Sequence, residues 1–143
     1  MKRDHRKWVW QSGLATAIGL LLITSIARAT WDPNAYRDES TLEVLTVGPD
    51  EGDHWSTLWL VVIDNAVYLR LGTRAAERFK QNTTAPLVSV RIAGNEFTKV
   101  RAEPAPDQAA AVAAAMAGKY WTDVFVRHFD HPLTVRLVPQ ASP

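Results

Sequence analysis

The chain contains no cysteine among its 143 residues. This absence excludes disulfide bridges, thiol catalysis and metal sites built on thiolates. The chain also lacks a nucleophile motif, a phosphate-binding loop and a dinucleotide fingerprint. With 47% hydrophobic residues, it is long enough for one domain with a core but too short for two large ones. The function therefore has to be inferred from individual side chains.

A surplus of basic charge is also missing outside the first 29 residues. These hold five of the 16 basic residues and one of the 15 acids, so the remainder carries a formal charge of −3. A nucleic-acid-binding domain needs a basic face that displaces counterions from phosphates. Binding to nucleic acid is therefore not expected.

Residues 1–29 have the pattern of an export segment. A basic stretch at residues 2–7 precedes a charge-free span at residues 8–26. This span approaches the roughly 17–25 residues that cross a bilayer, whereas Ala27 and Ala29 are small residues of the kind that a signal peptidase requires. Residues 1–29 are thus either a signal peptide or an N-terminal membrane anchor, a hydrophobic helix that would bind the membrane if it stays uncleaved. The domain that follows is expected to be membrane-anchored and to face the periplasm or exterior, or to be secreted after cleavage.

The folded domain is expected at residues 42–139, after a tether at residues 30–41 and before a tail at residues 140–143. Runs rich in β-branched and aromatic residues predict six short strands. We place them at residues 42–47, 55–63, 67–71, 87–92, 96–103 and 133–138.

Turn and helix signals connect these strands. Asp64-Asn65 and Ala93-Gly94-Asn95 suit tight hairpins whose corners need positive φ. Two short helices are predicted at residues 74–81 and 108–117; we expect Asp107 to cap the second, alanine-rich helix and Gly118 to end it. Hairpin-linked strands with a helix after the third predict a mainly β (α+β) fold, a small antiparallel barrel without exposed edges.

The segment from Trp59 to Arg70, followed by a basic helical turn and by the strand at residues 87–92, resembles the core of the split β-barrel proteins. These are the relatives of pyridoxamine phosphate oxidase and the flavin reductases. The similarity covers most of residues 42–138 and is greatest to a small, poorly characterised subgroup. A Gly-centred hairpin and a Tyr-containing helical segment of that subgroup correspond to Gly94 and to Lys119-Tyr120. The resemblance implies a six-stranded antiparallel split β-barrel with two short helices.

The resemblance also implies a ligand. In that superfamily FMN or a deazaflavin lies in a groove between the two barrels of a homodimer, and its phosphate is held from the third strand and the helical turn after it. By position, the cofactor-binding residues of this chain would be Arg70, Thr73, Arg74 and Lys80. No catalytic residue can be assigned in this way.

The same residues have other interpretations. Arg70 shares a strand face with Tyr68, and a guanidinium beside an aromatic ring suits a planar anionic ligand. The alternative is a solvent-facing arginine on the barrel wall. Thr73 could cap the helix, and Arg74 and Arg78 have the spacing of a solvated helix face. A helix N-terminus is nevertheless itself an anion site.

Two further groups of residues have candidate roles in the sequence. Trp55 and Trp59 lie on one strand face, where they would fill the barrel or form the seam of a homodimer. His128, Asp130 and His131 could share a metal ion, but we interpret them as a polar turn before the last strand, so no metal site is expected.

Two classes of function remain. The first is an exported or membrane-anchored split-barrel protein that binds FMN or a related deazaflavin in an oxidoreductase role. The alternative is a membrane-tethered binding or scaffold module without a cofactor.

Overall fold

The computed structural model describes residues 29–120 and 131–140. The predicted N-terminal hydrophobic helix lies outside these residues, as do His128 and Asp130. Within the described part of the chain, no helix has the length and apolar character needed to cross a bilayer.

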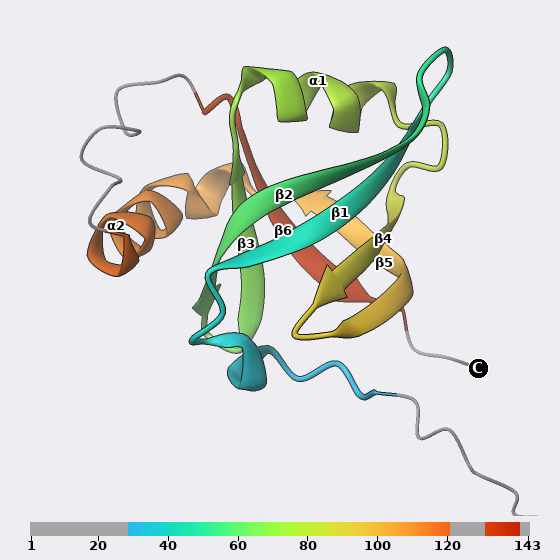
Figure 1. Ribbon diagram of the computed structural model, residues 1–143. Helices are drawn as coiled ribbons and strands as arrows, with labels where there is room; N and C mark the ends of the chain where they lie inside the picture. Colours follow the sequence, from blue (N-terminus) through green and yellow to red (C-terminus); the bar gives the residue numbers. More distant parts are fainter. Residues whose placement is uncertain (1–28, 121–130, 141–143) are drawn as a thin grey trace, which may run out of the picture.

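Six antiparallel strands form a closed barrel in the order β1-β2-β3-β6-β5-β4 (Figure 1). The six-stranded barrel predicted from the sequence is thereby confirmed. The strands are β1 (Thr41–Gly48), β2 (Gly52–Ile63), β3 (Ala66–Leu71), β4 (Leu87–Ile92), β5 (Asn95–Pro104) and β6 (Leu133–Pro139). Strand β2 begins earlier than predicted, because its polar first residues continue the β1–β2 ladder as far as Gly48 and Gly52.

Two hairpin turns have the backbone that their sequences predicted. Asp64 and Asn65 have φ values of 45° and 59°, and Ala93 and Gly94 have φ values of 49° and 76°. Two consecutive residues with positive φ match the right-handed twist of the flanking strands. These turns fix the β2–β3 and β4–β5 registers.

Alternate residues of the strands fill the barrel. The fully buried side chains include Leu60, Leu69 and Val90. Residues expected to form only a tether also belong to this core: the 3-10 helix η1 (Pro33–Tyr36) places Tyr36, 4% exposed, in edge-to-face contact with Trp31, and both rings contact Phe97. The packed domain thus begins well before residue 42.

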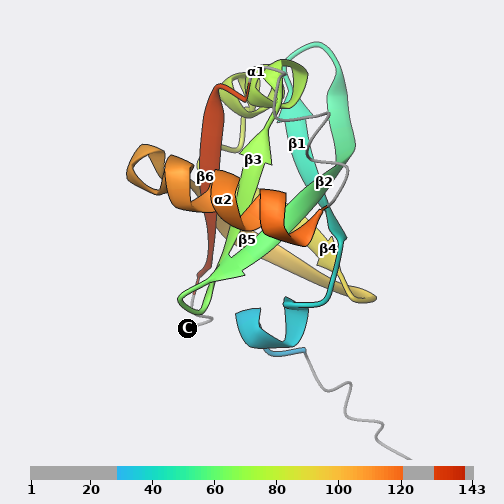
Figure 2. The same ribbon diagram turned by 90° about the vertical axis from the view of Figure 1, so that its left-hand side faces the viewer.

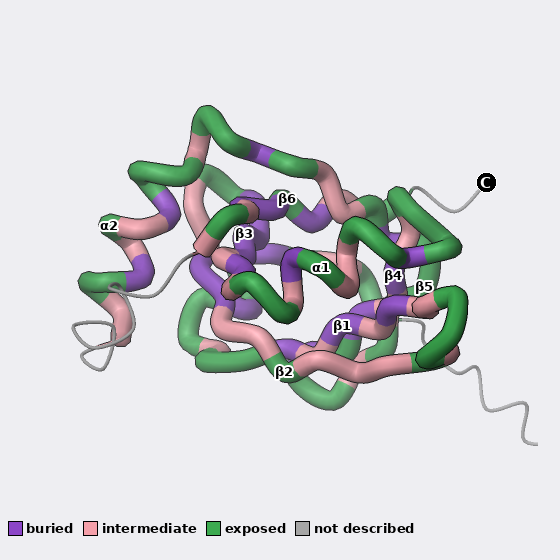
Figure 3. Tube along the Cα trace, turned by 90° about the horizontal axis from the view of Figure 1, so that it is seen from above, coloured by how far each residue is buried: buried purple, intermediate pink, exposed green. Residues whose placement is uncertain are grey.

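Two α-helices cover different parts of the barrel. Helix α1 (Thr73–Gln81) lies across one open end (Figures 1 and 3) and places Ala76 and Phe79 against the core. Helix α2 (Ala109–Lys119) packs on the outer wall of β2 and β3 through Val112 and Met116 (Figure 2).

The start and end of α2 differ from the prediction. Asp107 lies in a 3-10 turn, η2 (Pro106–Gln108), and the N-cap is Gln108. The helix passes through Gly118 and ends at Lys119, because the side chains of Lys119 and Tyr120 bind the main chain of neighbouring segments.

Candidate functional site

The candidate site is the corner where β3 ends and α1 begins, which we call the β3–α1 corner (Arg70, Gly72, Thr73 and Arg74). Leu69 and Leu71 are fully buried inside the barrel, so Tyr68 and Arg70 between them face outward. The predicted shared face therefore lies on the outer wall and not in the barrel opening. Helix α2 covers Tyr68, and Arg70, nearer the strand end, is half-buried.

Helix α1 opens without a side-chain cap. Gly72, in extended conformation at φ −70° and ψ 169°, is the N-cap residue. Thr73 is the first helical residue and is exposed, so the expectation that its hydroxyl caps the helix is wrong. The first intrahelical bond runs from the Ala76 amide to the Gly72 carbonyl, at 2.9 Å. The preceding amides of the first turn have no intrahelical acceptor and point out of the helix end.

The predicted phosphate contacts are not all brought together. Arg70, Thr73 and Arg74 lie at the N-terminal end of α1, but Lys80 is in its last turn, about 10 Å further along the helix axis. The Lys80 ammonium forms an ion pair with Glu77 at 2.9 Å. Arg74 is exposed at the corner.

Arg78 has a structural role at the same end of α1 as Lys80. Its guanidinium donates two hydrogen bonds to Glu51, at 3.1 and 3.2 Å, and so joins α1 to the β1–β2 hairpin. These bonds lower the pKa of Glu51 and raise that of Arg78. The basic residues of α1 thus divide into a paired C-terminal group and the exposed Arg74.

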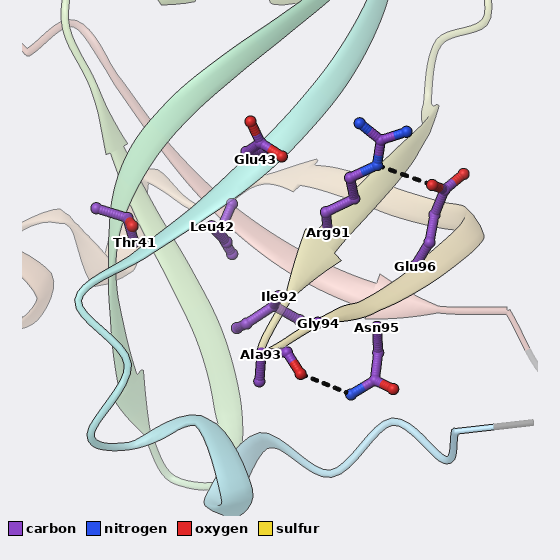
Figure 4. A pocket seen from close by; sticks show the side chains of 9 residues that line it. All are labelled: Thr41, Leu42, Glu43, Arg91, Ile92, Ala93, Gly94, Asn95 and Glu96. Carbon is purple, nitrogen blue, oxygen red and sulfur yellow. Dashed lines mark hydrogen bonds and ion pairs between the residues drawn. The ribbon is translucent and has the colours of Figure 1, made fainter.

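A separate hollow of about 350 Å³ lies between β1 and the β4–β5 hairpin (Figure 4). It contains none of the predicted site residues. Its Arg91 is engaged twice: Nε donates to Glu96 at 2.8 Å, and the guanidinium lies 3.8 Å from the centroid of the Trp55 ring. No motif in the sequence marks this cluster, although the predicted Ala93-Gly94 turn places Arg91 opposite Glu96.

Both tryptophans of β2 face away from the barrel interior, so the expectation that they fill it is wrong. Trp55 supports Arg91, and Trp59 stacks on Tyr120 with ring centroids 4.7 Å apart. Across residues 29–120 and 131–140, no three His, Asp or Glu side chains come together as a metal site.

A second cluster, which was not predicted from the sequence, holds the end of α2. The Tyr120 hydroxyl lies 2.7 Å from the carbonyl oxygens of both Ser40 and Leu60, and Lys119 donates to the carbonyls of Glu39 and Leu60. Burial lowers the pKa of Lys119 and raises that of Tyr120. These groups are occupied by main-chain acceptors and serve to fix the fold.

Comparison with known proteins identifies the fold. Neither the models of protein families nor the curated proteins match the chain. Solved structures do match, among them the conserved hypothetical protein Rv2991 from Mycobacterium tuberculosis, at 18% identity and a TM-score of 0.57, and the heme storage protein HutZ from Vibrio cholerae, at 16% identity and a TM-score of 0.55. Each alignment covers 76% of this chain. It covers 78% of the Rv2991 chain in the first case and 88% of the HutZ chain in the second. The chain has a split-barrel-like fold. At such identities the likeness to other split barrels shows the fold alone.

Proposed function

We propose that this split barrel binds FMN or a related deazaflavin in an oxidoreductase role, as an exported or membrane-anchored protein. The observation that carries the proposal is the uncapped N-terminus of α1 at the β3–α1 corner. A helix N-terminus presents free amide donors and the positive end of the helix dipole, both of which favour a phosphate.

The side chains around this helix end have suitable chemistry. Thr73 offers a hydroxyl and Arg74 an exposed guanidinium, and Arg70 lies two residues before the N-cap Gly72. Guanidinium groups bind phosphate oxygens through paired hydrogen bonds. Lys80 is not part of this arrangement, because it lies at the opposite end of α1 with Glu77.

The flavin ring would be accommodated between two copies of the barrel. A homodimer is part of the proposal, since the cross-strand partners Leu45 of β1 and Trp55 of β2 are half-buried on the outer wall, beyond the part of β2 that α2 covers (Figure 1). Burying these apolar side chains against a second copy of the barrel would stabilise a dimer.

The test is a titration of the protein with FMN, followed by quenching of flavin fluorescence. We expect Arg74→Ala to weaken binding about tenfold or more, because a hydrogen bond to a charged group is lost. Lys80→Ala is the matched control: it removes a cation from the same helix, and its affinity should equal that of the wild type. Wild-type protein that leaves the flavin unquenched, or equal losses in both variants, would refute the proposal.

Hemin is the second ligand in this titration, because one of the structural neighbours is a heme storage protein. If hemin gives a shift of its Soret band and FMN gives no response, the proposed ligand becomes a tetrapyrrole and not a flavin. No response to either ligand would favour the alternative function, a membrane-tethered binding or scaffold module without a cofactor.

A further inference from the structure

We infer that Thr134 of β6 completes the phosphate site at the β3–α1 corner and makes it a site for a phosphate monoester; this inference rests on the proposed function. No motif in the sequence marks Thr134. It is distinguished by its burial, by a side-chain hydroxyl that has no hydrogen-bond partner within the described residues, and by its position in the sheet.

Thr134 is only 6% exposed. Its carbonyl oxygen accepts a hydrogen bond from the Ala105 amide at 2.8 Å, but within the described residues its hydroxyl has no hydrogen-bond partner. A buried hydroxyl without a partner costs free energy, and such groups are uncommon in native structures. A bound acceptor at this position would supply the missing partner.

The sheet register places Thr134 beside Arg70. The two residues are direct partners in the antiparallel β3–β6 ladder, so their side chains lie on the same, outer side of the barrel wall. The next pair, Leu71 and Leu133, ends the ladder immediately before the N-cap Gly72. Figures 1 and 2 both show the start of β6 beside the N-terminal end of α1.

The donors at this corner come from three elements. Helix α1 provides first-turn amides with the side chains of Thr73 and Arg74, β3 provides Arg70 and β6 provides Thr134. A phosphate monoester has three terminal oxygens that can accept from these groups together. A carboxylate, or a phosphate esterified on both sides, offers only two. The arrangement thus favours FMN over a dinucleotide flavin or a carboxylate ligand.

The test is the variant Thr134→Val, which keeps the branched shape and removes the hydroxyl. Because that hydroxyl has no hydrogen-bond partner in the described part of the chain, the variant should fold with an unfolding temperature equal to or above that of the wild type. We expect it to bind FMN about tenfold more weakly. Its affinity for riboflavin, which has no phosphate, should not change.

Thr46→Val is the matched control. Thr46 of β1 is 2% exposed, lies inside the barrel, and within the described residues its hydroxyl is likewise without a hydrogen-bond partner. This variant should bind FMN as the wild type does. If Thr134→Val also binds FMN normally while Arg74→Ala binds weakly, the role of Thr134 is refuted and the proposed function stands. If wild-type protein does not distinguish FMN from riboflavin, both are refuted.

Discussion

At the scale of single residues, Lys99 of β5 has a strained, left-handed backbone conformation that lysine does not favour. The β4–β5 register shifts between Val88 and Val90, where a bulge gives β5 one additional residue, and Lys99 has a φ of 59°. This left-handed conformation costs most residues about 1 kcal/mol, whereas glycine adopts it readily. The strain is therefore set by the bulge.

We expect Lys99→Gly to keep the free energy of unfolding or to raise it by about 0.5 kcal/mol, because Lys99 is exposed and no packing is lost. Lys99→Val should lower it by about 1–2 kcal/mol, since a β-branched residue resists positive φ. Urea denaturation of the three proteins measures both effects. A glycine variant less stable than the valine variant would contradict this account of the bulge.

The sequence predicted some residue positions and not others for a physical reason. A period of two was enough to place Tyr68 and Arg70 on one face of β3. The period could not show whether this face points into the barrel or away from it. Residues on both faces of β3 are buried: Leu69 and Leu71 on one face, and Tyr68 on the other. Both faces of β3 are covered, the outer one by α2, which follows much later in the chain. That information is not local.

At the scale of elements, the end of α2 is held against β2 and the segment before β1. The Tyr120 hydroxyl serves the carbonyls of Ser40 and Leu60, and its single proton can satisfy one of them at a time. Because burial raises the pKa of Tyr120 above 10.0, its contribution to stability is complete below pH 10 and is lost as the pH rises through the higher folded-state value.

Tyr120→Phe should therefore lower the free energy of unfolding by about 1 kcal/mol at pH 7. The difference from the wild type should shrink as the pH rises above 10.0 and through the raised pKa of Tyr120. The titration of Lys119 changes stability in the opposite direction, because its lowered pKa makes the free energy of unfolding rise with pH up to 10.5. Lys119 is present in both proteins, so its effect largely cancels from the difference between them. Chemical denaturation at pH 7 and pH 11 gives the comparison. A difference that stays constant or grows would show that the hydroxyl is not the group that matters.

Elements were predicted well where local chemistry determines them. The strands and the Asp64-Asn65 turn follow from alternation and from residues that tolerate positive φ. The ends of α2 do not, since tertiary bonds from Lys119 and Tyr120 carry the helix beyond Gly118. The packing of Trp31 and Tyr36 was missed because a proline, an asparagine and mixed charges in that segment obscured two core aromatics.

At the scale of the whole molecule, the closed barrel places the N-terminus of α1 beside the start of β6, although the two are far apart in the sequence. The corner thus combines residues that no single motif contains. The order of the strands could be inferred from hairpins only in part, because β6 inserts between β3 and β5.

Export of the whole protein is a further prediction, based on the basic and charge-free pattern of residues 1–29. The full chain, fused at its C-terminus to a reporter enzyme that is active only outside the cytoplasm, should give an active reporter. The same fusion without residues 1–29 should be inactive. Activity in both fusions, or in neither, would contradict an export role for this segment.

The most direct test of the central claim is the ratio of the affinities of the wild-type protein for FMN and for riboflavin, measured under one set of conditions. The two ligands share the ring and differ in the phosphate, so the ratio isolates the β3–α1 corner. We predict that FMN binds about tenfold more tightly or better, and that salt reduces the difference. Equal affinities for the two ligands, or no binding of either, would contradict the account.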